Sequence, residues 1–286
     1  MACLSQEYPH TDIGFHTVPK EYERLKEIFR EMGSVLVAYS GGVDSTFLLK
    51  VAHDELGDRA IGVIACSETY PSDEIQAAEE LAHAIGVRVI KIHTDELRNE
   101  AFVQNTPDRC YYCKTELFNK LNQIAAQEGL NCVIHGGNID DFDDYRPGQK
   151  AAEELGVRAP LQEAGLAKAK IRELSKQAGL PTWDKPSFAC LSSRFPYGTP
   201  ITSDALTQID KAEKLLRSLG FRQVRVRHHG TIARIETELD EAPRLLDPSL
   251  RDKIVGGFKE LGYLYVTVDI EGYRTGSMNV PLGRTS

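Results

Sequence analysis

The segment VLVAYSGGVDSTFLLK, residues 35–50, constrains the fold more than any other part of the chain. Apolar residues run into Ser40, Gly41, Gly42, Val43, Asp44 and Ser45, and an apolar helical pattern follows. Glycines between a buried strand and a helix let backbone N–H groups approach a phosphate, and the helix N-terminus adds free donors. Ser40 and Ser45 would add hydroxyl donors. Asp44 would repel a phosphate on its own, so we expect it to hold Mg²⁺ that bridges the phosphates.

Strands alternate with helices on both sides of this segment. We expect helices over residues 20–32, 44–56, 72–85 and 115–127, and strands over residues 34–39, 60–66, 87–93 and 132–137. Helices of about 10–15 residues between short apolar strands predict an α/β fold with a parallel sheet covered on both faces. Ligands of such sheets lie at the carboxyl ends of the strands.

The pattern changes after residue 186. A loop rich in Pro, Ser and Gly covers residues 186–202, and two helices and three strand-like runs follow it. We therefore predict two domains, the α/β domain over residues 18–186 and a smaller α+β domain over residues 187–286. We expect the second to serve in substrate binding and oligomerisation.

Composition narrows the classes of protein. The net charge of −8 over 286 residues argues against a broad basic face for nucleic acid. No apolar run approaches the ~18 residues that a membrane helix needs. The first residues lack the basic and then apolar pattern of a signal peptide, so we expect a cytoplasmic protein.

The glycine loop matches one known phosphate motif and fails two others. No lysine follows at the spacing of G-x-x-x-x-G-K-[ST], and the G-x-G-x-x-G pattern is absent. The six residues 40–45 do fit S-G-G-x-D-S, and they resemble the PP-loop of the N-type ATP pyrophosphatases. That resemblance implies an adenine nucleotide alpha hydrolase-like fold, and ATP that adenylates a substrate and releases pyrophosphate.

A second polar segment, HGGNIDD, follows the fourth expected strand. Asn138 would face the nucleotide there. The aspartates that follow could add a Mg²⁺ ligand or form a solvated acidic loop; they are Asp140, Asp141, Asp143 and Asp144. Lys168 and Lys170, in a segment that resembles a helix of the same superfamily, could meet phosphate or point into solvent.

Three cysteines suggest sulfur chemistry at this site. Cys110 and Cys113 form a C-x-x-C pair, and Cys190 lies far away in the sequence. A [4Fe–4S] cluster on three thiolates would leave one iron open for an exogenous sulfide. Zinc would need a fourth protein ligand, and a redox disulfide would need a thioredoxin-like context. Both remain alternatives.

Several motifs together resemble the LarE family, the ATP-dependent sulfurtransferases of nickel-pincer nucleotide synthesis. They are SGGVDS, CLSSRFPYG around Cys190, AEKLLRSLGF with Glu213, VRVRHH with Arg225 and Arg227, and GYRTGSMN. The resemblance implies that pyridinium-3,5-biscarboxylic acid mononucleotide is the substrate. Arg194, Glu213, Arg225 and Arg227 would then contribute to its binding. Strand alternation places Arg225 and Arg227 on one face, where two guanidinium groups suit phosphate and carboxylates.

The resemblance leaves the sulfur source open. In single-cysteine members the residue that matches Cys190 attacks the adenylate and becomes dehydroalanine, whereas Cys110 and Cys113 indicate the three-cysteine, cluster-bearing type. We also predict a homo-oligomer. The alternative functions are a tRNA-thiolating enzyme, which would need a basic RNA surface, and an ammonia-using synthetase, which would not call for three cysteines.

Overall fold

The computed structural model describes residues 18–143, 147–186, 189–274, 276–277 and 280. The chain divides into two compact units: Met1–Thr94 with Cys110–Ser187, and Asp95–Arg109 with Phe188–Ser286. In the described residues, no helix is both long and apolar enough to cross a membrane.

The first unit contains a four-stranded parallel sheet. Its strands are β1 (Val35–Ala38), β2 (Ala60–Cys66), β3 (Val89–His93) and β4 (Cys132–His135). They lie in the order β3-β2-β1-β4, so the strand that leads into the glycine loop is central. The predicted α/β fold with a parallel sheet is confirmed.

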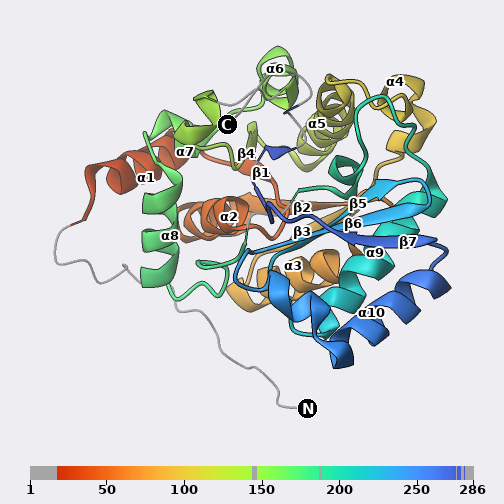
Figure 1. Cartoon of the computed structure of the whole chain (residues 1–286). Helices are drawn as coiled ribbons and strands as arrows, with labels where there is room; N and C mark the ends of the chain where they lie inside the picture. Colours follow the sequence, from red (N-terminus) through yellow and green to blue (C-terminus); the bar gives the residue numbers. More distant parts are fainter. Residues whose placement is uncertain (1–17, 144–146, 187–188, 275, 278–279, 281–286) are drawn as a thin grey trace. The chain divides into compact units, whose positions relative to one another are not determined.

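Helices cover both faces of this sheet (Figure 1). The helical segments are α1 (Lys20–Met32), α2 (Val43–Leu56), η1 (Gly57–Arg59), α3 (Ser72–Ile85), α5 (Arg109–Glu128), η3 (Ile139–Asp143), α6 (Pro147–Glu154), α7 (Pro160–Glu163) and α8 (Lys168–Gln177). Val35 and Val37 pack with α1, α2, α3 and α8, whereas Leu36 packs on the opposite side with α5 and α6. Because β1 buries both faces, its sequence is a continuous apolar run rather than an alternating one.

The predicted boundaries match closely at β2 and α3 and fail at α5. That helix begins at Arg109 rather than at residue 115, so Cys110 and Cys113 lie within its first two turns. Two cysteines and two tyrosines of weak helix propensity precede the amphipathic part, so the local pattern did not indicate the true start.

The second unit is a small α+β fold. Its elements are η2 (Glu96–Arg98), α4 (Glu100–Val103), η4 (Leu191–Arg194), α9 (Ser203–Ser218), β5 (Val224–His229), β6 (Ile232–Thr237), η5 (Ala242–Leu246), α10 (Pro248–Glu260) and β7 (Tyr265–Val268). β5 pairs antiparallel with β6, and β6 pairs parallel with β7. One face of this sheet, with Val224 and Val226, packs in a core with Leu216 and Phe258.

Residues 95–109 join the second unit, although the sequence analysis placed them in the first. The N–H of Gly198 donates to the carbonyl of Asn105 at 3.0 Å, and Asn105 Nδ2 donates to the carbonyl of Pro196 at 2.7 Å. The N–H of Ile201 donates to the carbonyl of Val103 at 3.0 Å. The predicted division at residue 186 remains a proposal, and this segment is an addition to its second part.

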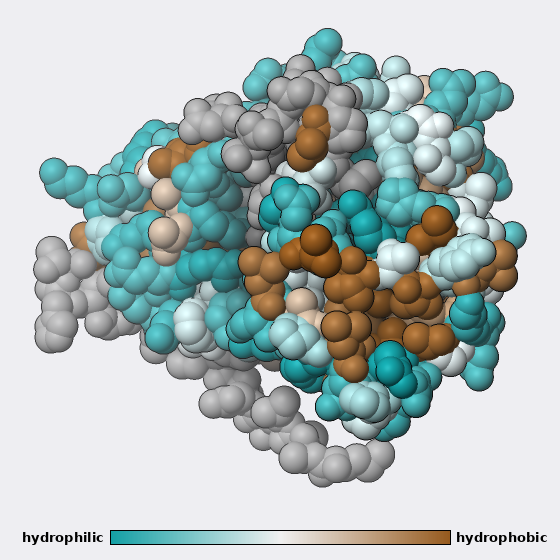
Figure 2. Space-filling view, in the orientation of Figure 1, coloured by the Kyte–Doolittle hydropathy of each residue, from teal (hydrophilic) through white to brown (hydrophobic). Residues whose placement is uncertain are grey.

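Hydrophobic side chains gather on one face of the second unit (Figure 2). The large apolar residues exposed in this unit are Ile232, Leu239, Leu246, Val255, Leu264, Tyr265, Ile270 and Val280. Ile270 is 90% exposed, which is unusual for an isoleucine next to a strand end.

Candidate active site

Hydrogen bonds of Ser40 and Ser45 hold the glycine loop in a turn. Ser45 Oγ accepts a hydrogen bond from the Ser40 N–H at 3.2 Å and lies 3.0 Å from Ser40 Oγ. Ser45 Oγ also donates to the Gly42 carbonyl at 3.3 Å. The two hydroxyls therefore preform the turn ahead of α2, in addition to any contact with a ligand.

Two glycines are required by close packing. Gly41 has φ +69°, and a Cβ added there would lie 2.7 Å from the Cβ of Ala78 on α3. A Cβ at Gly136, just after β4, would lie 3.0 Å from the Ser45 nitrogen. Backbone segments from three parts of the chain thus meet at the start of α2, where the helix presents its free N–H groups.

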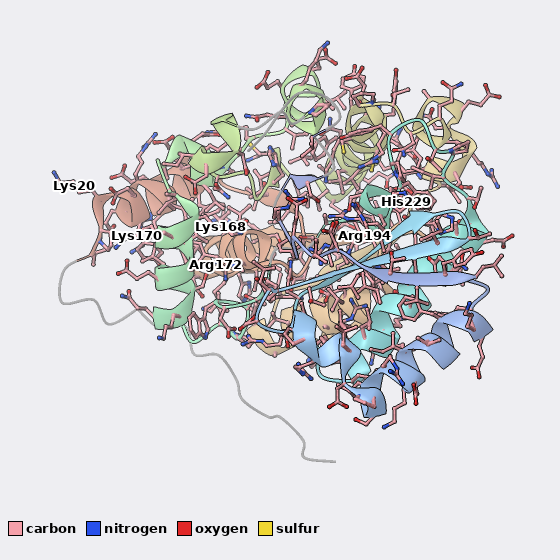
Figure 3. All side chains as sticks on the ribbon, in the orientation of Figure 1. Lys20, Lys168, Lys170, Arg172, Arg194 and His229 are labelled. Carbon is pink, nitrogen blue, oxygen red and sulfur yellow. The ribbon has the colours of Figure 1, made fainter. Side chains whose placement is uncertain are left out.

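Asp44 lies in the first turn of α2 and pairs with a lysine from another helix. Lys168 (Figure 3) is the first residue of α8, and its ammonium group contacts Asp44 Oδ2. The Asp44 side chain is 20% exposed and that of Lys168 is 30% exposed. Of the two lysines considered from the sequence, Lys168 is at the loop, whereas Lys170 pairs with Glu173.

The second carboxylate oxygen of Asp44 has no hydrogen-bond partner. Oδ1 is buried, and no described residue donates to it. Burial raises the pKa of Asp44 above its usual range; Lys168 opposes this effect, and the nearby Asp141 adds to it. A buried carboxylate oxygen without a donor fits a hard cation such as Mg²⁺, and Asp44 would hold that ion beside the phosphate loop.

The HGGNIDD segment, residues 135–141, lies beside the glycine loop and Asp44. Asn138 is buried; its N–H donates to Asp141 Oδ2 at 3.0 Å, and its Oδ1 accepts from the Asp140 N–H at 3.0 Å. Asp140 Oδ2 accepts from the backbone N–H of Lys168 at 2.8 Å, which fixes the start of α8. These two aspartates thus have structural partners. The Asp143 side chain and Asp144 lie outside the described residues.

His135 ends β4 as a neutral imidazole. Burial lowers its pKa to about 4, and the nearby Lys114 acts in the same direction. Its Nδ1 accepts from the Gly137 N–H at 3.2 Å, so the proton resides on Nε2. The ring lines a cavity of about 340 Å³, together with Gln149, Arg158 and Gln162.

The cysteines divide between the two units. Cys110 and Cys113 are three residues apart near the start of α5, which puts both thiols on one side of the helix. Both are half-buried, as is Cys190, which precedes η4 in the second unit. Across the described part of the chain, no three His, Cys, Asp or Glu side chains of the structure form a metal-binding group. The three-thiolate cluster therefore remains a proposal.

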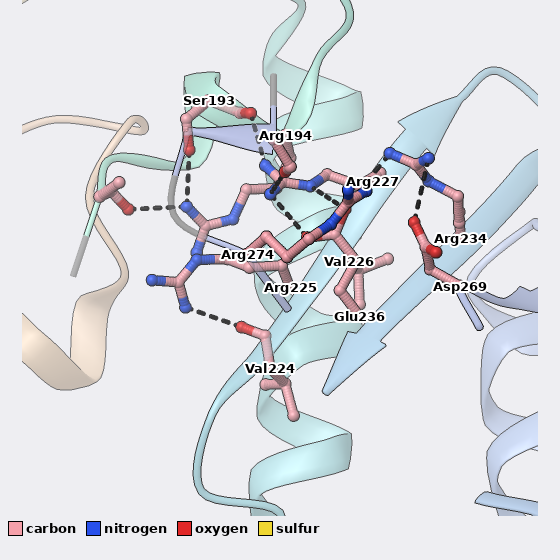
Figure 4. Close-up of polar contacts among 12 residues, drawn as sticks. Ser193, Arg194, Val224, Arg225, Val226, Arg227, Arg234, Glu236, Asp269 and Arg274 are labelled. Carbon is pink, nitrogen blue, oxygen red and sulfur yellow. Dashed lines mark hydrogen bonds and ion pairs between the residues drawn. The ribbon is translucent and has the colours of Figure 1, made fainter. Parts of the chain in front are cut away.

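A buried ion pair fixes the backbone around Cys190. Arg194, which Figure 4 shows beside Ser193 and Arg227, pairs with Glu213; both are 0% exposed, and they make two parallel hydrogen bonds of 2.8 and 2.9 Å. Arg194 Nη1 also donates to the carbonyls of Ala189 and Cys190 at 2.8 and 3.1 Å. Glu213 accepts in turn from the Val226 N–H at 3.0 Å. The pair thus joins the cysteine loop, α9 and β5.

The arginine face of β5 is buried instead of solvated. Arg225 and Arg227 share that face, as predicted, and each is 4% exposed. Arg227 makes a bidentate pair with Glu236 at 2.9 and 2.6 Å and donates to the Ser193 carbonyl at 2.9 Å. Glu236 was not among the predicted site residues, although the alternation of TIARIET places it opposite Arg225 in an antiparallel pair.

Arg225 contacts a backbone carbonyl and an aromatic ring, and its pKa is lowered. It donates to the Val224 carbonyl at 2.8 Å and lies over the ring of Tyr273 at 5.2 Å. Burial lowers its pKa to about 10, and the positive charge of Arg194 contributes, because Glu213 offsets only part of it. An additional anion at this guanidinium would therefore be stabilised.

Several known proteins are similar in sequence to this chain over nearly its whole length. The sequence profile of the NAD synthase family matches residues 21–126. An uncharacterized protein of Synechocystis sp. is 44% identical over 257 residues, which cover 90% of this chain and 96% of that protein. A pyridinium-3,5-bisthiocarboxylic acid mononucleotide synthase of Lactiplantibacillus plantarum is 43% identical over 265 residues, 92% of this chain and 95% of the synthase. An uncharacterized protein of Methanocaldococcus jannaschii is 30% identical over 254 residues, 88% and 94% of the two chains.

Asp44→Asn should stabilise the ligand-free protein at pH 7. The raised pKa of Asp44 means that its charged form costs folding energy, and the amide avoids that cost. The gain should shrink as the pH falls and should vanish below 3.8, the usual carboxyl value, because Asp44 is then protonated in the folded and unfolded chains alike. Thermal melts would show it, at about 2–4 °C per 1 kcal/mol.

Asp54→Asn is the matched control in the same helix. Asp54 accepts from Lys50 Nζ at 2.6 and 2.7 Å, so its loss should lower the melting temperature at pH 7. A lower melting temperature for Asp44→Asn as well would contradict the assigned cost of the Asp44 charge.

Glu213→Gln should destabilise the protein by about 3–5 kcal/mol, because it leaves the buried Arg194 without its counter-charge. Urea unfolding would measure the loss. The control Glu27→Gln removes a carboxylate that is 56% exposed in an ion pair with Arg24 and should change stability by less than about 1 kcal/mol. Equal effects of the two variants would contradict a structural role for the buried pair.

Proposed function

This chain belongs to the LarE family of pyridinium-3,5-bisthiocarboxylic acid mononucleotide synthases, and we propose that it uses ATP to replace carboxylate oxygen with sulfur on pyridinium-3,5-biscarboxylic acid mononucleotide. It is a sulfurtransferase of the PP-loop type. The observation that carries the proposal is the Asp44 carboxylate at a preformed loop, because one of its oxygens is buried and has no hydrogen-bond partner. The product would serve the nickel-pincer nucleotide cofactor of lactate racemase.

ATP binding is assigned to the start of α2. The N–H groups of Gly41 and Gly42 and the hydroxyls of Ser40 and Ser45 would donate to the phosphates. When bound, Mg²⁺ would neutralise phosphate charge. Lys168 pairs with Asp44, and its partly exposed ammonium can turn towards an incoming phosphate once a cation takes its place.

The first step forms an acyl adenylate. A substrate carboxylate oxygen attacks the α-phosphorus of ATP, the bond between the α-phosphorus and the bridging oxygen breaks, and pyrophosphate leaves with the bonding pair. Charge shifts towards the leaving pyrophosphate during this step. The N–H groups at the start of α2 and the Lys168 ammonium are the groups of this chain that would stabilise it.

Substrate binding is assigned to the arginine face of the second unit. Burial and the neighbouring Arg194 charge lower the pKa of Arg225, so a substrate carboxylate or phosphate beside this guanidinium would be stabilised. Arg227 and Arg194 already have bidentate partners in Glu236 and Glu213. Their proposed contribution is to hold the face and the Cys190 loop in position.

Two routes deliver sulfur to the activated carbonyl. In the first, Cys110, Cys113 and Cys190 would be ligands of a [4Fe–4S] cluster, which supplies a site for an exogenous sulfide. In the second, the Cys190 thiolate attacks the carbonyl carbon and AMP leaves. A base then takes the Cα proton, a Cα–Cβ double bond forms, and the Cβ–S bond breaks to give thiocarboxylate and dehydroalanine. We favour the first route, because α5 carries two thiols on one side.

The remaining proposals concern assembly and location. We propose a homo-oligomer, for which the exposed apolar residues of the second unit would provide contact area. We also propose a cytoplasmic location, where the cysteines would stay reduced.

Asp44→Asn should abolish pyrophosphate release from ATP and the biscarboxylic mononucleotide, because the amide cannot replace a carboxylate as a Mg²⁺ ligand. A coupled pyrophosphate assay would measure the loss, and Asp54→Asn should retain release. Release at the parent rate by Asp44→Asn would refute the assignment of the loop.

Cys110→Ala separates the sulfur routes. On the cluster route, the anaerobically reconstituted variant should lose the visible absorbance and the multiple turnover together, while Cys132→Ala, on the neighbouring β4, should keep both. Intact mass spectrometry after reaction supplies the second readout. Loss of one H₂S at Cys190 in the parent, with Cys110→Ala still active, would exclude the cluster route and support the sacrificial one.

A further inference from the structure

Lys185 reaches the glycine loop from a segment that the proposed mechanism does not use. Its ammonium donates to the Gly41 carbonyl at 3.1 Å and pairs with Glu74 of α3 at 2.6 Å. Its side chain is 22% exposed and that of Glu74 is 25% exposed, so water competes only partly for this contact. The lysine is 144 residues from Gly41 in the sequence, and the contact therefore depends on the tertiary fold.

The segment that carries Lys185 is held by α8. Arg172 Nη1 donates to the Trp183 carbonyl at 2.7 Å, and its Nη2 donates to the Lys185 carbonyl at 2.8 Å. Arg172 is four residues after Lys168, so one helix presents a cation to Asp44 and a second cation to the Lys185 segment (Figure 3). α8 thus positions both lysines that contact the loop region.

The contact with the Gly41 carbonyl has a geometric consequence. In a trans peptide the C=O of one residue and the N–H of the next point in opposite directions. A Gly41 carbonyl turned towards Lys185 therefore turns the Gly42 N–H the other way. In the part of the chain that the structure describes, that N–H donates to no protein acceptor, as expected of a group reserved for an anion.

Nothing in Gly41 itself would hold this orientation. Glycine adopts positive and negative φ with similar ease, so its φ of +69° must be fixed by its surroundings. Ala78 of α3 packs against the Cα side, and the ammonium group restrains the carbonyl. Glu74 is one turn before Ala78 on the same helix, so α3 supplies both the wall and the carboxylate that aims Lys185.

We propose that Lys185, aimed by Glu74, is a positioning residue that orients the Gly41–Gly42 peptide so that the Gly42 N–H faces the pyrophosphate part of ATP. This inference rests on the proposed function of the loop. It assigns the lysine an action through the backbone and no contact with the phosphates.

The test is the binding of Mg²⁺–ATP and of Mg²⁺–pyrophosphate by calorimetry. Lys185→Met should weaken both ligands about tenfold, equivalent to about 1.4 kcal/mol, since a charge-assisted hydrogen bond is lost. Lys185→Arg should recover most of the affinity, because its guanidinium can still donate to the carbonyl. Lys91→Met is the matched control: Lys91 pairs with Glu79 of α3 at 2.9 Å and does not reach the loop. It should bind as the parent does.

Glu74→Gln decides between positioning and direct contact. If Lys185 acts through the carbonyl, loss of the carboxylate that aims it should weaken pyrophosphate binding. If the ammonium contacts phosphate, loss of a competing carboxylate should leave binding unchanged or strengthen it, and that result would overturn the inference. Thermal melts verify that each variant is folded; should Lys185→Met unfold, Lys185→Arg and Glu74→Gln still give the answer.

The outcomes also distinguish a failure of the proposed function of the loop from a failure of the proposed role of Lys185. A parent protein that binds neither ligand would refute the proposed function of the loop, and the inference with it. A parent that binds both, with Lys185→Met indistinguishable from Lys91→Met, would refute the role of Lys185 alone. In steady state, the expected signature is a raised KM for ATP with a smaller change in kcat.

Discussion

The first unit is organised around a carboxylate that is costly to bury. Asp44 must stay close to a loop that presents N–H groups, yet burial raises its pKa and one of its oxygens has no donor. Contacts from the surrounding chain offset only part of the cost of burying this charge. Asp140 fixes the start of α8, α8 brings Lys168 to the other oxygen, and Arg172 on the same helix holds the next segment. An arrangement that gives up stability at one group in this way is typical of a functional site.

The sequence allowed the first unit to be predicted well, because its signals are local. A continuous apolar run, six loop residues and glycines at helix ends are sufficient to place β1, α2 and the order of strands and helices. The start of α5 could not be read in the same way, since its first turn has no apolar period. Its position is set by packing, which a local pattern does not report.

The second unit was harder to predict than the first, because its burial depends on long-range contacts. Strand alternation placed Arg225 and Arg227 on one face correctly, but it could not tell a solvated face from a buried one. The difference comes from Glu213 and Glu236, which lie on other elements and neutralise guanidinium groups that would otherwise be too costly to bury. Long-range ion pairs of this kind have no period in the sequence. Arg194 also has a structural role: it donates to the carbonyls of Ala189 and Cys190, and Cys190 itself is half-buried.

The membership of residues 95–109 in the second unit has a consequence for how such a chain can be divided or inherited. The polypeptide passes from one unit to the other three times, near residues 94, 109 and 187. A fragment cut at the last crossing would lack Asn105, whose carbonyl and amide satisfy Gly198 and Pro196. The second unit is therefore not a module that gene fusion could append to or detach from the end of another PP-loop protein in one event. Recombination would have to transfer an internal segment together with the carboxyl-terminal part, and the two would be expected to change in concert during evolution.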